Sequence, residues 1–227
     1  MSNNIIFIIY SIVALGGSLF SFKMGRIWLC AYIAACVVLM NIFVLKQMTL
    51  FGMAVTGGNV LYSSIFLSSD LLTEHYGKKV ALQAVRIGFF ISVFFVIASQ
   101  FILLFHPNEF DFIQDSFLEI FSLTPRIVAA SMLSYLLSQH LDVYLFEKIK
   151  DLSKGRYLWL RNNLSTFLSQ AVDSVFFTLA AFYGVFANNV IWQIILFTYL
   201  VKLIVALLDT PFIYLSKLEI MKPLDKN

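Results

Sequence analysis

Charged residues are scarce in this chain. Asp, Glu, Lys and Arg together make up 13% of its 227 residues, about half their share in an ordinary soluble domain. Hydrophobic residues make up 60%, and 24 residues are Phe. A soluble domain of this length could not hide so much apolar surface. The composition therefore excludes a soluble globular protein and predicts an integral membrane protein, with the lipid bilayer as its surroundings.

Cysteine, linker residues and early basic residues are also scarce. The two cysteines, Cys30 and Cys36, share one apolar run, which excludes a disulfide framework or a cysteine-based metal site. A net charge of +3 gives no footprint for nucleic acid. No Gly/Ser/Pro-rich linker divides the chain, so one compact bundle is expected. No Lys or Arg precedes Lys23, which favours a retained span at residues 4–22 over a cleaved signal peptide.

Motifs that carry catalysis or nucleotide binding are missing as well. The chain has no His-Glu-x-x-His zinc pair, no Gly-x-Ser-x-Gly elbow and no Gly-x-x-x-x-Gly-Lys-Ser/Thr phosphate loop. An intramembrane enzyme built on Asp142 and Asp173 is the less favoured alternative, because the two aspartates are expected at different depths. We therefore expect a non-enzyme without cofactor or metal, and any ATP-driven motor would be another polypeptide.

What the chain does contain is a series of apolar runs. A helix that crosses about 30 Å of hydrocarbon needs about 20 residues. Seven runs meet this length, at residues 4–22, 26–46, 50–74, 79–105, 125–148, 163–187 and 189–216. The third carries Gly57, Gly58 and Asn59 in its first half, which predicts a broken or unwound start of the kind that lines a cavity.

Basic residues gather at alternate connections between these runs. They are Lys23 and Arg26, then Lys78 and Lys79, then Lys148, Lys150, Lys154, Arg156 and Arg161, and finally Lys217, Lys222 and Lys226. The connection 106–124 holds four acidic residues and no Lys or Arg. Since basic connections mark the cytoplasm, the N-terminus is predicted outside and the C-terminus inside. Tyr157 and Trp159, with Arg156 and Arg161, are expected to form an interfacial anchor at the inner surface.

Two ionisable residues are predicted to meet near the middle of the membrane. Insertion of a central Asp or Lys costs roughly 2.5–3.5 kcal/mol, so such residues need a partner and usually have a function. Asp173 lies eleven residues into its run from the inside and Lys202 thirteen residues into its run from the outside. At about 1.5 Å per residue, both reach the midplane. We expect them to approach each other.

A second group of ionisable residues is expected in the inner half of the membrane. Its members are Asp70, Glu74, Arg86, Asp142 and Asp209. They could form a network that opens as a gate on the cytoplasmic side, relay protons, or only hold helices together.

Four of the predicted helices carry one polar stripe each at helical spacing. The stripes are Asn59-Tyr62-Phe66-Asp70, Ser131-Tyr135-Ser138-Asp142, Thr166-Gln170-Asp173-Phe177 and Tyr199-Lys202-Ala206-Asp209. Two of them include a Ser-Gln-x-x-Asp-x-x-x-Phe sequence, beginning at Ser138 and at Ser169. Because polar side chains that face lipid cost free energy, we expect these stripes to converge inside the bundle.

Four segments carry a family resemblance: "FLSSDLLTEHYGKKVA", "LSQHLDVYLFEKIK", "LWLRNNLSTFLSQAVDSVFFTLAAFYG" and "YLVKLIVALLDTPFIY". Over roughly residues 27–216 the chain resembles the vitamin-uptake-transporter family of queuosine precursor transporters. That family is described with six spans. The resemblance thus implies an all-α bundle of six to seven transmembrane helices in the bacterial inner membrane. By the same resemblance, residues 1–25 are expected to form an extra helix, 26–217 the six-helix bundle and 218–227 a short cytoplasmic tail.

The resemblance also implies a small-molecule substrate. It would be a 7-deazaguanine, namely 7-cyano-7-deazaguanine, 7-aminomethyl-7-deazaguanine or queuine. A carboxylate can accept hydrogen bonds from two adjacent N–H groups of such a base, and amides supply mixed donors and acceptors. Aromatic rings cover the faces of the base. The candidate binding residues are Asn59, Tyr62, Phe66, Gln139, Gln170, Asp173, Phe177 and Lys202.

One alternative comes from the same resemblance. The family is similar to the membrane substrate-binding subunits of energy-coupling-factor vitamin transporters, which would make this chain one part of a larger machine. Both an oligomer and a separate energising partner stay open.

Overall fold

The chain folds into a bundle of helices. The computed structural model describes residues 2–122 and 125–224. These residues contain seven long helices: α1 (Asn3–Met24), α2 (Arg26–Phe43), α3 (Asn59–Tyr76), α4 (Lys78–Ile102), α6 (Pro125–Leu152), α7 (Leu158–Phe182) and α8 (Asn188–Leu215). The shorter elements are strands β1 (Gln47–Leu50) and β2 (Met53–Thr56), helix α5 (Gln114–Phe121) and the 3-10 helix η1 (Glu219–Met221). The predicted helical bundle is confirmed.

Five of the long helices, α1, α2, α4, α7 and α8, are long and apolar enough to cross a membrane. This confirms a multi-pass membrane protein. Helices α3 and α6 are more polar, because they carry residues such as Asp70 and Asp142, which are fully buried. Helix α3 lies inside the bundle, whereas α6 exposes one face with Leu133, Leu137 and Tyr144. The number of helices that cross, and the orientation of the termini, stay predictions.

Helix α7 buries its polar residues and exposes its apolar residues, as expected for a helix that faces lipid. Its buried residues are all polar except Leu158 and Ala181, whereas Leu164, Leu168 and Val175 are exposed. A water-soluble helix has the opposite arrangement. The apolar side chains that a soluble protein would bury here form the outer surface, and the polar stripe predicted for this helix faces inward.

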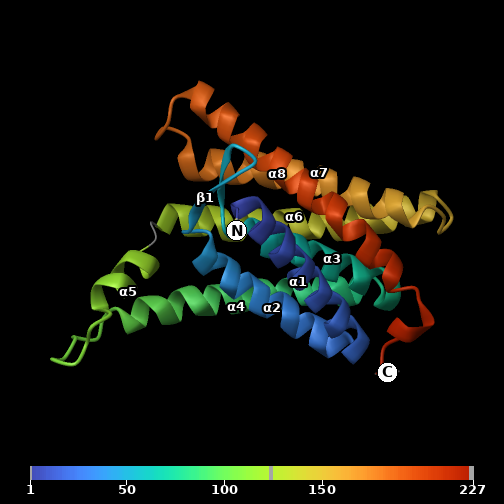
Figure 1. Cartoon of the computed structure of the whole chain (residues 1–227), viewed down its shortest axis with the longest axis horizontal. Coiled ribbons are helices and arrows are strands. Elements are labelled where there is room, and N and C mark those ends of the chain that lie inside the picture. Colours follow the sequence, from blue (N-terminus) through green and yellow to red (C-terminus); the bar gives the residue numbers. More distant parts are fainter. Residues whose placement is uncertain (1, 123–124, 225–227) are drawn as a thin grey trace.

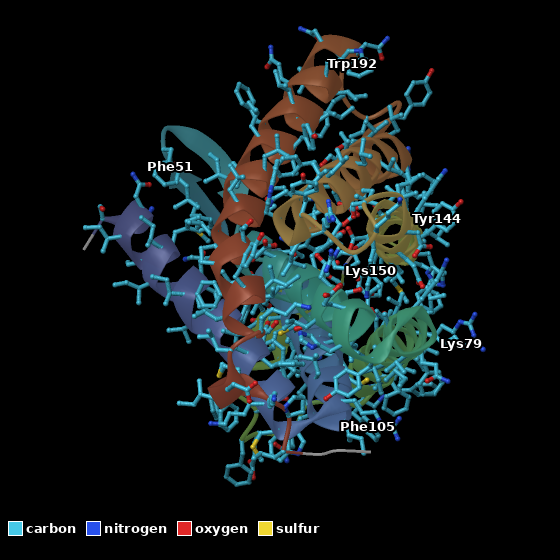
Figure 2. All side chains as sticks on the ribbon, turned by 90° about the vertical axis from the view of Figure 1, so that its right-hand side faces the viewer. Phe51, Lys79, Phe105, Tyr144, Lys150 and Trp192 are labelled. Carbon is cyan, nitrogen blue, oxygen red and sulfur yellow. The ribbon has the colours of Figure 1, made fainter. Side chains whose placement is uncertain are left out.

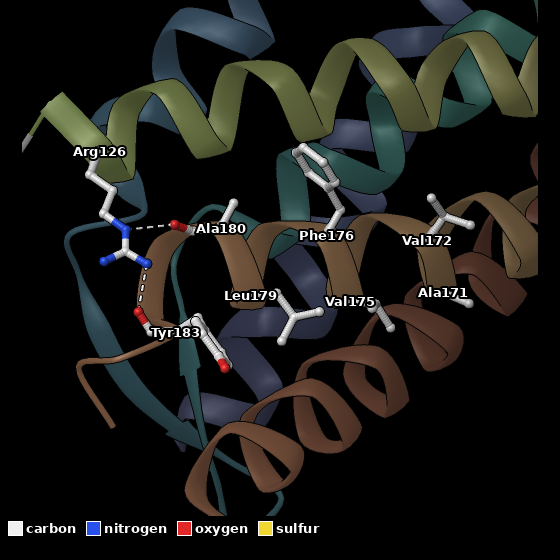
Figure 3. Close-up of a pocket in the computed structure, with 8 residues that line it drawn as sticks. All are labelled: Arg126, Ala171, Val172, Val175, Phe176, Leu179, Ala180 and Tyr183. Atoms are coloured by element: carbon white, nitrogen blue, oxygen red, sulfur yellow. Dashed lines mark hydrogen bonds between the residues drawn. The ribbon is translucent and has the colours of Figure 1, made fainter. Parts of the chain in front are cut away.

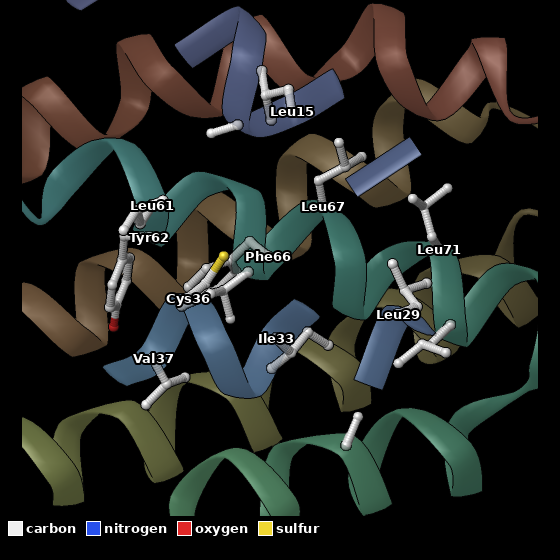
Figure 4. Close-up of a cluster of buried hydrophobic side chains, with 14 of the residues drawn as sticks. Leu15, Leu29, Ile33, Cys36, Val37, Leu61, Tyr62, Phe66, Leu67 and Leu71 are labelled. Atoms are coloured by element: carbon white, nitrogen blue, oxygen red, sulfur yellow. The ribbon is translucent and has the colours of Figure 1, made fainter. Parts of the chain in front are cut away.

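The apolar core lies on the other side of the bundle, where α1, α2 and α3 pack together. Leu15, Leu29, Ile33, Phe66 and Leu71 meet there and are almost fully buried (Figure 4). Helix α3 runs between this core and the polar faces of α6 and α8. It presents Tyr62 and Asp70 toward the site. Toward α1 and α2 it presents apolar residues together with Ser64 and Ser68, which bond Cys36 and Ser18.

Two of the helix connections consist of one glycine. Gly25 joins α1 to α2 with φ 120°, and Gly77 joins α3 to α4 with φ 86°. Residues with a side chain rarely adopt these angles, so glycine permits the abrupt reversals. Both turns, the α6–α7 connection and the C-terminal segment lie toward one end of the bundle, and the hairpin, α5 and the α7–α8 connection lie toward the other (Figure 1).

The third predicted span was wrong at its start. Residues 47–56 form an antiparallel hairpin, with Met48 opposite Val55, and α3 begins at Asn59 rather than at residue 50. The turn places Phe51 and Gly52 at positive φ, 52° and 80°, as a two-residue hairpin turn requires. The expected irregular backbone is therefore a folded hairpin.

Helix α1 holds this hairpin. The Asn4 side chain accepts a hydrogen bond from the Phe51 amide at 3.0 Å, and the Asn3 amide donates to the Thr49 carbonyl at 3.3 Å. The rings of Phe7 and Phe51 meet edge to face, with centroids 6.3 Å apart. Helix α1 also packs on α2, α3 and α8, so it is joined to the rest of the bundle along its length.

Candidate functional site

Asp173 on α7 is the centre of a buried polar cluster contributed by four helices. Its Oδ1 accepts a hydrogen bond from the Tyr62 hydroxyl of α3 and another from Ser134 Oγ of α6 at 2.6 Å. Its Oδ2 forms an ion pair with the Lys202 ammonium of α8. The carboxylate is 4% exposed and Lys202 is 8% exposed, so both charges lie within the bundle. We call these four residues the Asp173 cluster.

The Asp173–Lys202 pair confirms the contact predicted from helical depth. The Lys202 ammonium also lies 4.5 Å from the centre of the Tyr62 ring, in the range of a cation–π interaction. The Tyr62 hydroxyl is 3.3 Å from Ser138 Oγ, and the Tyr62 and Phe66 rings are 5.2 Å apart. The predicted convergence of the four polar stripes is observed at this point.

Buried amides follow the Asp173 cluster along α6 and α7. Gln139 is 0% exposed and Gln170 is 2% exposed. In the described part of the chain, neither Nε2 nor Oε1 of Gln139 has a hydrogen-bond partner, and Oε1 of Gln170 has none either. Buried polar groups are nearly always bonded. These two amides thus offer unused donors and acceptors within a turn of the two aspartates, Asp142 and Asp173.

Three carboxyl groups form the next layer. Asp70, Asp142 and Asp209 come from α3, α6 and α8 and are each 0% exposed. Ser169 Oγ donates to Asp142 Oδ1 at 3.1 Å, and the Asn162 amide donates to Asp209 Oδ1 at 2.7 Å. The side chains of Asp70 and Asp142 lie against each other, and no described residue donates a hydrogen bond to either oxygen of Asp70. We call these three residues the aspartate trio.

Glu74 closes the end of the bundle. Its carboxylate pairs with Arg161 Nη2 of α7 at 2.6 Å, with Lys150 Nζ of α6 at 3.3 Å, and with Lys217 beyond α8. Figure 2 looks onto this end, with Lys150 between the helix ends and Lys79 at the rim. One carboxylate therefore ties four helices together at the end that carries the basic connections. We call these residues the Glu74 clamp.

A groove of about 840 Å³ runs along α7, outside the polar cluster. Apolar side chains such as Val172, Val175 and Leu179 line it, and Arg126 at its end donates to the carbonyls of Ala180 and Tyr183, each at 2.7 Å (Figure 3). These bonds satisfy carbonyls of the last turn of α7. None of the candidate binding residues lines this groove.

The structure brings most of the predicted residues together, with three qualifications. Phe177 is half-buried and its ring packs on Phe182, with centroids 5.9 Å apart. The side chain of Asn59 falls outside the described part of the structure. Arg86 is exposed on α4 and has no ion pair in the described part of the chain. Its expected place beside the inner carboxylates is not observed.

Sequence reasoning missed several members of the site. Arg161 was assigned to an interfacial anchor, and this was wrong, because it is 2% exposed and bound to Glu74. Tyr157 and Trp159 are 61% and 50% exposed, as an anchor requires. Ser134, Asn162 and Ser169 also bind the buried carboxylates, and their helical spacing from Ser138, Thr166 and Asp173 was the available signal.

Comparison with known proteins decides the family. The family described as "Putative vitamin uptake transporter" matches residues 56–216. The chain is 37% identical over 219 residues to the "Probable queuosine precursor transporter" of Bacillus subtilis (strain 168), covering 96% of each chain.

The chain belongs to the vitamin-uptake-transporter family. A second relative, the "Queuosine precursor transporter" of Escherichia coli (strain K12), is 27% identical over 166 residues, which covers 69% of this chain and 68% of that protein. No solved structure matches the chain. The family match contains the Asp173 cluster, the aspartate trio and Glu74, and it leaves α1 and α2 outside. The match to the Bacillus protein covers so much of both chains that it includes most of α1.

Proposed function

We propose that this chain imports queuosine precursors and binds a 7-deazaguanine, such as 7-cyano-7-deazaguanine, at the Asp173 cluster. Two relatives are named queuosine precursor transporters. One of them matches this chain over almost its whole length. The observation that carries the site is the buried Asp173 carboxylate, one turn along α7 from the buried Gln170, whose amide oxygen has no partner among the described residues.

The chemistry of the base suits these residues. A guanine-like edge presents two adjacent N–H donors beside a carbonyl acceptor. Asp173 accepts hydrogen bonds from the two N–H groups. Lys202 donates a hydrogen bond to the carbonyl or orients the carboxylate. Gln139 and Gln170 supply mixed donors and acceptors. The Tyr62 and Phe66 rings cover the flat faces, with Phe177 at the edge.

Binding requires Asp173 to exchange partners. In this structure the carboxylate already accepts hydrogen bonds from Ser134, Tyr62 and Lys202, so the site is closed around its own side chains. The neutral hydroxyls of Ser134 and Tyr62 are the donors to release, because Lys202 would otherwise lose its only ion-pair partner in the described residues. A base that donates two protons replaces two hydrogen bonds with two others, and the exchange costs little net free energy.

The Glu74 clamp serves as the inner gate in this proposal. It lies at the basic end of the bundle, which we place in the cytoplasm by the positive-inside rule, with the hairpin outside. The protein then sits in the bacterial cytoplasmic membrane with seven crossings, an external N-terminus and no catalytic role. Opening toward the cytoplasm must separate Glu74 from Arg161, Lys150 or Lys217, which frees the inner ends of α3, α6, α7 and α8.

Uptake of labelled 7-cyano-7-deazaguanine tests this proposal. The assay uses a bacterial strain unable to make the precursor and liposomes that contain the purified chain alone. Wild-type protein and Asp115→Asn, an exposed change on α5, should transport the base, whereas Asp173→Asn should not, at equal amounts in the membrane. Normal uptake by Asp173→Asn removes Asp173 from the site. Uptake in cells but not in liposomes without ATPase subunits favours a binding subunit of a larger transporter.

A further inference from the structure

We infer that the aspartate trio carries the proton that couples import to the proton gradient. The inference rests on the proposed function, since it supplies the driving force for the same transport. It concerns residues that are separate from the Asp173 cluster. It identifies residues of this chain that couple import to the proton gradient.

Asp70 and Asp142 are placed as a proton-sharing pair. Their side chains lie against each other, and two carboxyl groups in contact can form a hydrogen bond only when a proton lies between them. No other described residue donates to either oxygen of Asp70. Asp70 is fully buried, so water cannot take that role without the bundle opening. The pair is therefore held together by a proton that the chain itself does not provide from a basic side chain.

The surroundings of the pair contain acceptors in excess of donors. Oδ2 of Asp142 and Oδ2 of Asp209 have no partner in the described part of the chain. The Asn162 side chain points at Asp209 through its amide nitrogen, and its own Oδ1 is unpartnered although Asn162 is 0% exposed. Buried acceptor oxygens without donors need protons or a small cation. The unpartnered Oδ1 of Asn162 indicates this shortage of donors independently of the carboxyl groups.

The groups that face the trio from each neighbouring helix leave it without a cation. Around Asp70 and Asp142, among the described residues, they are Asp209 from α8, Glu74 one turn along α3, and the hydroxyls of Ser165, Thr166 and Ser169 from α7. Ser18 of α1 and Cys36 of α2 bond Ser64 of α3 instead. On α4, Arg86 is exposed. The nearest buried cations, Lys202 and Arg161, are engaged by Asp173 and Glu74.

A proton fits the arrangement better than a metal ion. Among the described residues, no three His, Cys, Asp or Glu side chains are grouped closely enough to hold a metal ion. Two of the carboxyl groups lie against each other with a third beside them, and a cation such as sodium needs a cage of several oxygens. Sodium is nevertheless the other monovalent cation that could satisfy these oxygens, so the test must distinguish the two.

The position of the trio links it to transport. Along α3 the order is Tyr62, Asp70 and Glu74, so the trio lies two turns from the Asp173 cluster and one turn from the Glu74 clamp. A proton that enters from outside with the base is held between Asp70 and Asp142 while the clamp is closed. When the clamp opens, water reaches the carboxyl groups and the proton leaves to the cytoplasm. One proton then moves inward with each base.

Liposomes that contain the purified chain test this coupling with labelled 7-cyano-7-deazaguanine. With the outside one pH unit more acidic, one proton per base should accumulate the label about tenfold. A protonophore should abolish accumulation, and a sodium gradient should not replace the pH gradient. A trapped pH dye should report acidification of the interior when unlabelled base is added outside.

Variants separate the coupling from binding. Asp142→Asn and Asp70→Asn should lose accumulation and acidification but still exchange internal labelled base for external unlabelled base. Asp151→Asn, an exposed change on the same helix as Asp142, should behave as wild type. If the buried variants do not fold, the wild-type gradient measurements decide alone.

Three results would overturn the inference. Accumulation driven by sodium assigns the oxygens to that ion. Equilibration without accumulation under every gradient leaves an importer without coupling, so the proposed function survives and the inference does not. Wild-type liposomes that move no base under any gradient remove the proposed function and the inference together.

Discussion

Tyr62 and Asp173, 111 residues apart in the sequence, are joined by a hydrogen bond from the phenol to the carboxylate. The bond ties α3 to α7 where Lys202 arrives from α8. One tyrosine thus contacts the anion through its hydroxyl and the cation through its ring, 4.5 Å from the ammonium. The pair defines a closed state, in which the groups proposed to bind the substrate bind one another.

Replacing Tyr62 with Phe tests this closure. The ring and its packing on Phe66 are kept, but Asp173 loses one donor. A hydrogen bond to a charged group contributes about 1.5–3 kcal/mol, so the free energy of unfolding should fall by that amount. Thermal unfolding in detergent measures the change. Tyr199→Phe is the matched control, since its hydroxyl bonds a backbone carbonyl at 3.3 Å from a partly exposed position, and it should cost about 1 kcal/mol or less. Equal shifts for both variants contradict the account.

Glu74→Gln should weaken the basic end of the bundle. The change leaves Arg161, whose side chain is 3% exposed, without its anion, and a buried pair broken from one side costs about 3–5 kcal/mol. The melting temperature should drop and inward opening should become easier, visible as faster exchange of backbone amides in the last turn of α3.

The exposed pair of Glu219 and Lys222 provides the comparison for this prediction. Its side chains are 86% and 67% exposed, and such pairs contribute little stability. Glu219→Gln should leave the melting temperature unchanged. A Glu74→Gln protein as stable as Glu219→Gln would show that the ion pairs of Glu74 do not stabilise this end of the bundle.

Gly57 is predicted to be intolerant of a methyl group. A Cβ there would lie 2.8 Å from the Phe43 carbonyl oxygen, a backbone atom that cannot move without shifting α2. Gly57→Ala should therefore destabilise the protein by about 1–3 kcal/mol, measured by thermal unfolding. Gly16→Ala on α1 meets nothing within 4 Å and should be neutral or slightly stabilising. Loss of stability in both variants would point to a general effect of alanine rather than to crowding at the hairpin.

The orientation in the membrane is accessible to thiol labelling. In a background without Cys30 and Cys36, a single cysteine at Asn108 should react with a membrane-impermeant maleimide in intact cells. One at Lys154 should react only after the membrane is permeabilised. Both positions are exposed, so access alone decides the result. The reverse pattern would invert the topology and place the Glu74 clamp outside.

Part of the site was predictable from the sequence because helices have a fixed rise. Counting residues from the ends of two apolar runs placed Asp173 and Lys202 at one depth, and the structure confirms their contact. The inward turn of the polar stripes followed from the cost of facing lipid. Depth and polarity are both properties of single helices, which one sequence can provide.

The rest depends on how helices are rotated against one another. Arg86 was placed at the right end of α4 but on the wrong face. The small residues Ala81, Ala84 and Gly88 form the buried face, and they were the signal that Arg86 points away. Asp70 and Asp142 were placed in one inner group, but the sequence did not select which members of that group touch, because α3 is buried on almost all sides. The hairpin was missed because its apolar composition resembles a span.

Equilibrium binding of labelled 7-cyano-7-deazaguanine to the purified protein is the most direct test of the central claim, that Asp173 recognises the base. Removing one partner of a buried, charged hydrogen-bonded pair costs about 2–5 kcal/mol, so Asp173→Asn should bind about 30-fold more weakly or worse. Asp115→Asn should bind as wild type. An Asp173→Asn protein that is folded and binds the base with wild-type affinity would contradict the account.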